Sequence, residues 1–202
     1  LSSVAVAEQG DWIVRGRAII VAPQEDASGV QPAFPNGSVE VENAVVPELD
    51  FTYFLTDNLG LELILATSPH DLEGTGDLSS LGTIGDVWAL PPTLTLQYHF
   101  QPEANVRPYI GVGINYTIFY NEDATSSLNE AIGDTSISLD DSVGIAVQAG
   151  VDVDINDTWF WNADVKWIQI ETEATLNTGG AINTVDVELD PIVAGIGIGR
   201  RF

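Results

Sequence analysis

The chain has 202 residues and a formal net charge of −24, with 30 acidic residues against 6 lysines and arginines. This charge excludes nucleic acid as a partner, because nucleic-acid-binding surfaces are basic. The absence of cysteine excludes disulfides and thiolate metal sites, and a hydrophobic fraction of 45% excludes a disordered acidic protein.

Eight segments alternate apolar and polar residues with the period of a β-strand. They are 11–22, 45–56, 60–70, 86–100, 107–120, 137–155, 159–171 and 185–202. We interpret residues 1–10 as an N-terminal arm, in which Ala5-Val6-Ala7 resembles a signal-peptidase site, so that residues 1–7 are alternatively a signal-peptide remnant. Residues 11–202 are then expected to form one domain.

Most of these segments exceed the ~5–6 residues usual in soluble sheets and suit the ~9–11 residues that cross a bilayer at a tilt. Their connections alternate in length. Short turns at 56–60, 101–106 and 156–158 alternate with long polar loops at 23–44, 71–85, 121–136 and 172–184. We therefore predict an all-β fold: an eight-stranded antiparallel up-and-down transmembrane β-barrel.

The charged residues of the strands share one face. In 107–120 and 142–155 one face is an apolar band and the other is small or polar. Charged side chains facing lipid would be prohibitively costly near the bilayer midplane, whereas inside a narrow barrel they can pair. We expect a charged plug in the lower lumen, made of Arg15, Arg17, Glu48, Asp50, Glu62, Asp152, Asp164 and Lys166.

The stretch LPPTLTLQYHF, residues 90–100, alternates cleanly from Thr93 onward but begins with two prolines. Pro91 and Pro92 cannot donate ladder hydrogen bonds, so pairing with the strand at 60–70 is expected to stop there. Pro69 on that neighbouring strand is expected at the same level. The prolines either interrupt the barrel wall or lie above the membrane and merely end the strand.

Apolar side chains are expected to face into the upper lumen, where a water-filled pore would need polar ones. They are Ile64, Trp88, Leu90, Phe119, Ile168 and Ile170. They form either a path for hydrophobic molecules or ordinary packing, since eight strands leave little interior space. The two histidines, His70 and His99, lie far apart in the sequence and form no nucleophile or zinc motif. We therefore expect no enzymatic activity, no cofactor and no metal.

The long loops are acidic throughout, which is typical either of a solvated surface in a saline habitat or of divalent-cation bridging to lipopolysaccharide. The chain ends GIGIGRRF, with a terminal aromatic residue on an alternating strand. This resembles the signal by which the insertion machinery recognises outer-membrane barrels, with Arg200 at the position of the usual second aromatic residue.

Together these segments resemble the OmpW family of eight-stranded outer-membrane proteins, and QGDW at 9–12 is similar to its AlkL-like members. The segments that carry the resemblance are 49–69, 90–100, 107–120, 140–156 and 189–202. The acidity of the loops and Val143, where the family often has tryptophan, depart from the pattern.

The resemblance implies a passive channel in the outer membrane of a Gram-negative bacterium, with extracellular loops and periplasmic termini. Small hydrophobic solutes would enter the upper lumen and leave through a lateral opening at Pro69, Pro91 and Pro92. Its expected partners are these solutes, lipid and lipopolysaccharide, and the insertion machinery, with the oligomeric state left open. The alternative is a structural or receptor barrel that acts through its acidic loops.

Overall fold

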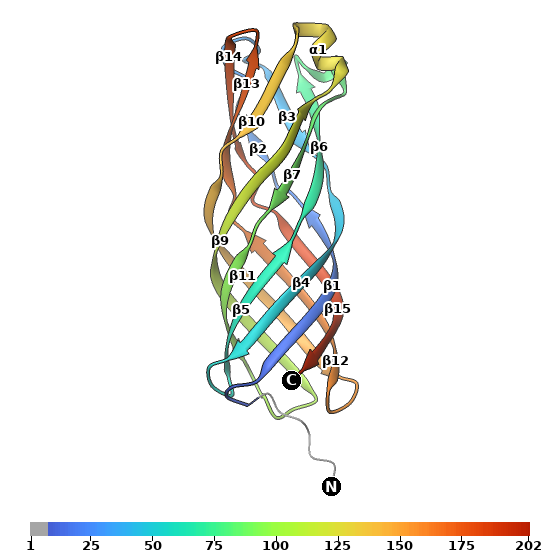
Figure 1. The fold of residues 1–202 in the computed structure, drawn as a ribbon, viewed down its shortest axis with the longest axis vertical. Helices are drawn as coiled ribbons and strands as arrows, with labels where there is room; N and C mark the ends of the chain where they lie inside the picture. The colour runs from blue at the N-terminus through green and yellow to red at the C-terminus, as the bar shows by residue number, and fades with distance from the viewer. Residues whose placement is uncertain (1–7) are drawn as a thin grey trace.

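The computed structural model describes residues 8–202, so the signal-peptide interpretation of residues 1–7 lies outside the described residues. The chain forms a tall barrel of tilted strands (Figure 1). Eight strands build its wall: β1 (Trp12–Ala22), β4 (Ala44–Phe54), β5 (Leu59–Ala66), β8 (Thr93–His99), β9 (Val106–Ala124), β11 (Ser142–Asp154), β12 (Trp159–Ile168) and β15 (Ile192–Arg201).

The barrel closes by antiparallel pairing in chain order. β1 pairs with β4, then β4 with β5, β5 with β8, β8 with β9, β9 with β11, β11 with β12 and β12 with β15. The pairing of β15 with β1, from Ile13↔Arg201 to Ala22↔Ile192, completes the ring. The predicted eight-stranded up-and-down barrel is confirmed.

Short turns join the wall strands at one end, where the C-terminus also lies (Figure 1). Local side chains set two of them. The Thr56 hydroxyl accepts hydrogen bonds from the backbone N–H groups of Asn58 and Leu59, and Asn156 Oδ1 accepts from those of Thr158 and Trp159. Such side-chain bonds replace the ladder where the backbone reverses.

The predicted long loops contain more regular structure than expected. The elements that lie in or overlap them are β2 (Asp26–Ala27), β3 (Gly37–Val41), β6 (Ser68–Gly76), β7 (Thr83–Leu90), β10 (Thr135–Leu139), β13 (Glu171–Thr178) and β14 (Ala181–Glu188), with the 3-10 helix η1 (Ser79–Leu81) and α1 (Ser126–Ile132). These strands continue the wall at the end opposite the short turns (Figure 1). Their inward residues, such as Leu72, Ile84 and Val185, are buried and apolar, while acidic outward residues hide this alternation in the sequence.

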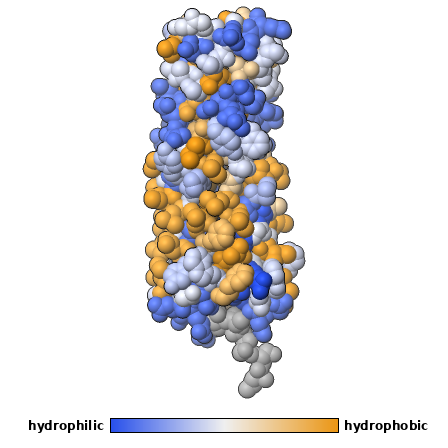
Figure 2. All heavy atoms as spheres, viewed as in Figure 1, coloured by the Kyte–Doolittle hydropathy of each residue, from blue (hydrophilic) through white to orange (hydrophobic). Residues whose placement is uncertain are grey.

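The outer surface of the wall strands is apolar. Side chains such as Ile114, Trp161 and Ile196 are 62%, 55% and 69% exposed, and Figure 2 shows a hydrophobic band around the barrel with hydrophilic residues above and below it. Such a band, bordered by aromatic residues, is typical of a surface that faces lipid.

Residues 8–202 contain no helix that is long and apolar enough to cross a membrane.

Candidate functional site

Ion pairs fill the lower lumen. Arg15 Nη1 lies 3.1 Å from Asp50 Oδ1, and Arg15 Nη2 lies 3.1 Å from Asp152 Oδ2. Arg17 Nε lies 2.7 Å from Glu48 Oε1, and Arg17 Nη2 lies 2.7 Å from Asp50 Oδ2. These side chains are at most 3% exposed. Two neighbouring arginines of β1 therefore bridge carboxylates on β4 and, across the lumen, on β11.

The remaining charges of the plug join the same network. Lys166 Nζ lies 3.1 Å from Glu48 Oε1 and 2.7 Å from Asp164 Oδ1. Glu62 Oε2 accepts a 2.7 Å hydrogen bond from Gln148 Nε2. All eight residues predicted for the charged plug are buried, and their mutual contacts satisfy charges that would be costly to bury alone. The network closes the lower lumen with polar contacts.

An apolar cavity lies directly above the charged plug. Its volume, counted as the space open to the centre of a water molecule, is about 90 Å³, several times what one water requires. Aliphatic and aromatic side chains make up most of its lining, among them Ile64, Val87, Phe119, Ile168, Ile170 and Val187. Glu48 belongs to both regions, because it lines the cavity and pairs with Arg17.

The wall beside this cavity contains a break in strand pairing. The ladder between β5 and β8 ends at Ile64↔Thr93. The ladder between β6 and β7 begins at Ser68↔Ala89. Both pairs share one register, so three residues on each side face one another without a ladder. We call this six-residue region the ladder break.

The ladder break consists of residues 65–67 and 90–92, all of which the structure describes. Pro91 has no N–H to donate toward residue 66 opposite it, which prevents normal antiparallel pairing here, and Pro92 has none to donate toward β9. On the other side, the Pro92 carbonyl still accepts a 3.1 Å hydrogen bond from the N–H of Tyr116. The break therefore lies between two stretches of chain, one formed by β5 followed by β6 and the other by β7 followed by β8. The contact of the second stretch with β9 persists.

The structure places the other predicted residues as follows. Ile64, Phe119, Ile168 and Ile170 line the cavity. Pro91 and Pro92 both lie in the ladder break, and Pro91 also lines the cavity.

Three predicted positions were wrong. Trp88 and Leu90 do not line the cavity; Val87 and Ala89 do so in their place. The Trp88 ring instead lies 6.1 Å from that of Tyr120. The alternation continues unchanged through the two prolines, so odd-numbered residues face inward on both sides of them. Pro69 pairs with Trp88 above the ladder break and is exposed, outside the break itself.

His70 and Ser68 were not among the residues predicted to line the lumen, but both face its interior. His70 and Ser68 are 7% and 5% exposed and line the cavity. Burial lowers the pKa of His70 from its ordinary value, although the hydrogen bond to the Glu42 carbonyl and the charge of Asp71 oppose this shift. Even-numbered residues of this segment face inward, as Glu62 and Ile64 do. The same alternation could have predicted that Ser68 and His70 face inward.

Over residues 8–202, no group of three or more His, Cys, Asp or Glu side chains is arranged to hold a metal ion.

Comparisons with known proteins agree with this architecture. The model of the OmpW family matches residues 8–202. Outer membrane protein W of Escherichia coli (strain K12) is 40% identical over 196 residues, which cover 96% of this chain and 90% of that protein. The dibenzothiophene metabolism operon protein PahQ of Pseudomonas aeruginosa is 30% identical over 206 residues, covering 100% of this chain and 93% of that one. The crystal structure of OprG from Pseudomonas aeruginosa matches with a TM-score of 0.91 and 32% identity, covering 98% and 99% of the two chains.

Proposed function

Since this chain belongs to the OmpW family of outer-membrane proteins, we propose that it is a passive outer-membrane channel for small hydrophobic molecules. Solutes enter the apolar cavity from the end opposite the short turns, which faces the cell exterior. The strand extensions β3, β6, β7, β10, β13 and β14 build this end (Figure 1). They leave sideways, through the ladder break, into the lipid. The short turns and the termini face the periplasm. The route needs no catalytic group, cofactor or energy source.

One observation carries this proposal. Ala66 and Pro91, which face each other across the ladder break, both line the apolar cavity. The wall thus loses its backbone pairing at a place where the cavity lies directly behind it. In hydrocarbon, unpaired backbone is tolerated where it lines a cavity or water. The position of the break therefore supports a lateral exit.

The level of the ladder break suits an exit into the outer leaflet. Below it, the outward residues of β5 include Leu61 and Leu63, which are 38% and 39% exposed. Above it, the outward residues of β6 include the acidic residues Asp71 and Glu73. The outer surface changes from apolar to acidic across the break, so a molecule leaving there meets the upper edge of the lipid.

The charged plug explains why the exit would be lateral. An apolar solute that continued straight down would have to separate Arg17 from Glu48 and Asp50, which are buried charges that cost several kcal/mol to leave unpaired. The name of the relative PahQ, a dibenzothiophene metabolism operon protein, supports an apolar cargo, since dibenzothiophene is a fused aromatic compound.

The experiment is uptake of a small alkane by cells that keep intact lipopolysaccharide. We compare wild type, the double variant Pro91→Ala/Pro92→Ala and an empty vector, at matched amounts of heat-modifiable barrel. The substitutions return two N–H donors to the wall, so the strands can pair and uptake is expected to fall toward the vector level. Pro69→Ala is the matched control, because it changes a proline of the same wall outside the ladder break.

If wild-type uptake exceeds that of the empty vector and the double variant matches wild type, the lateral route is contradicted. Equal uptake in all strains would favour the alternative function, a scaffold or receptor that acts through its acidic extracellular surface.

A further inference from the structure

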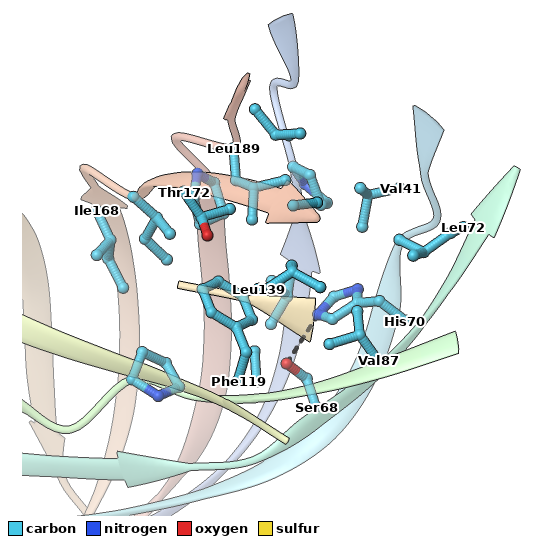
Figure 3. Close-up of a pocket in the computed structure, with 18 of the residues that line it drawn as sticks. Val41, Ser68, His70, Leu72, Val87, Phe119, Leu139, Ile168, Thr172 and Leu189 are labelled. Atoms are coloured by element: carbon cyan, nitrogen blue, oxygen red, sulfur yellow. Dashed lines mark hydrogen bonds between the residues drawn. The ribbon is translucent and has the colours of Figure 1, made fainter. Parts of the chain in front are cut away.

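The cavity is apolar but not wholly so. Among the residues of 8–202 that line it, five have polar side chains: Glu48, Ser68, His70, Thr93 and Thr172. Figure 3 shows Ser68, His70 and Thr172 among the aliphatic side chains around the cavity. A buried polar group is costly unless it is hydrogen-bonded, so the partners of these five decide what a solute in the cavity can bind.

The partners of His70 fix its tautomer. His70 Nδ1 lies 2.8 Å from the backbone carbonyl of Glu42, and His70 Nε2 lies 2.8 Å from Ser68 Oγ. A carbonyl can only accept, so Nδ1 carries the proton and Nε2 of the neutral ring is an acceptor. Ser68 therefore donates its hydroxyl proton to His70, and the lone pairs of Ser68 Oγ remain available (Figure 3).

The other hydroxyl protons are also already donated. Thr93 Oγ1 donates to the Pro91 carbonyl at 3.0 Å, and Thr172 Oγ1 donates to the Asp140 carbonyl at 2.7 Å. Glu48 is a carboxylate held by the plug. The polar side chains that line the cavity thus offer oxygen lone pairs and no uncommitted O–H or N–H group.

We propose that Ser68 is a binding site for the single donor group of an uncharged amphiphile, such as an aliphatic alcohol, on its way to the lateral exit. This inference rests on the proposed channel function. Ser68 begins β6 directly above the ladder break, and its pairing partner Ala89 also lines the cavity. Its own proton goes to His70, which polarises its oxygen as an acceptor.

The site discriminates by donor capacity. An alcohol can donate to Ser68 Oγ while its chain occupies the aliphatic cavity. A ketone or ether of the same length has only acceptors and meets only acceptors, so its oxygen stays desolvated and unpaired. One neutral hydrogen bond corresponds to a preference of roughly threefold to tenfold. The cavity therefore favours alcohols over ketones beyond their difference in lipid partitioning.

The test compares uptake of octane, 1-octanol and 2-octanone in wild type, Ser68→Ala/His70→Phe, Ser68→Thr and an empty vector. The double variant removes the Ser68 hydroxyl without leaving His70 Nε2 as a substitute acceptor, so it is expected to lower the 1-octanol to 2-octanone ratio by roughly threefold to tenfold, with octane uptake as the reference for any general loss of transport. Ser68→Thr keeps the hydroxyl and should restore the ratio. Ser136→Ala, an exposed serine on β10, is the matched control.

An unchanged ratio in Ser68→Ala/His70→Phe overturns the site, and so does equal loss of all three compounds, because these residues would then only stabilise the wall. If wild type carries no octane above vector, the channel proposal itself fails. A binding readout separates the two cases. The chain has 2 histidines, so ¹⁵N-histidine NMR resolves His70 with His99 as internal reference. Added 1-octanol should shift the His70 Nε2 resonance and 2-octanone should not; equal shifts contradict the inference.

Discussion

The lower and the upper lumen use the same barrel but opposite chemistry. In the lower lumen, β1, β4, β11 and β12 send charged side chains inward, and ion pairs as short as 2.7 Å close it. In the upper lumen, the inward residues become aliphatic, and a cavity of about 90 Å³ remains. Long charged side chains reach across a narrow barrel and form ion pairs. Branched aliphatic side chains form no such contacts across the lumen. The identity of the inward residues thus decides which half is closed.

The largest expected effect comes from breaking the closed half. Arg15→Ala leaves Asp152 buried without its arginine partner and Asp50 paired with Arg17 alone. Removing one member of a buried ion pair costs about 3–5 kcal/mol, and we expect the free energy of unfolding to fall by that amount. Urea unfolding in lipid vesicles, followed by heat-modifiable gel mobility, measures it.

The matched control is Arg200→Ala. Arg200 is exposed, and its guanidinium lies 4.6 Å from the centre of the Phe202 ring, a contact that contributes about 0.5–1 kcal/mol at such sites. Similar losses for the two variants would contradict the structural role given to the charged plug.

A second change should close the open half with a smaller effect on stability. Ile168→Trp replaces a branched aliphatic side chain of the cavity wall with a larger indole ring. Alkane uptake is therefore expected to fall to the vector level. Overpacking costs about 1–3 kcal/mol in a filled core, and the open space should keep the cost at the lower end. Ile196→Trp is the control, because Ile196 is 69% exposed on the outer face. Undiminished uptake in Ile168→Trp would show that solutes bypass the cavity.

The smallest expected effect is a pH dependence from His70. Its folded-state pKa is lowered from the ordinary value of 6.5 by burial, so the folded state binds fewer protons than the unfolded state. The stabilisation is complete above the unfolded pKa and is lost as the pH falls from 6.5 toward the folded pKa. Asp71 opposes the shift, which keeps the effect modest.

Urea unfolding between about pH 7.5 and about pH 5.5, a range that spans the ordinary histidine pKa, measures this dependence. Wild type should lose more stability than His70→Phe as the pH falls. Parallel curves for the two proteins would contradict a buried, neutral His70.

The sequence was sufficient to predict the barrel and which charged residues of its strands are buried. Arg15, Asp152 and Lys166 stand on strands whose other face is continuously apolar, and a charge has only one acceptable side in lipid. The cost of placing a charge in lipid therefore decides which face of each strand points inward. The structure places these three residues in the lumen.

The upper half was predicted less well, because both faces are apolar in part of it. From Val87 to Leu90 each residue could face either way, and composition favoured the bulky Trp88 and Leu90. The unbroken alternation through Pro91 sends Val87 and Ala89 inward instead. The strand extensions, such as β6 and β13, were missed for a related reason. Their outer faces are acidic and solvated, so their composition predicts polar loops.

The central claim is that the cavity communicates with lipid through the ladder break, and a reversible lock across it tests this most directly. The chain has no cysteine, so Thr67→Cys/Leu90→Cys introduces a single pair within the ladder break and leaves both prolines in place. The flanking pairs Ile64↔Thr93 and Ser68↔Ala89 place these positions opposite each other, a spacing that a disulfide can span in an antiparallel sheet. Oxidation should abolish alkane uptake, and a reductant should restore it. Full uptake through a barrel whose cross-link has been verified would contradict the lateral route.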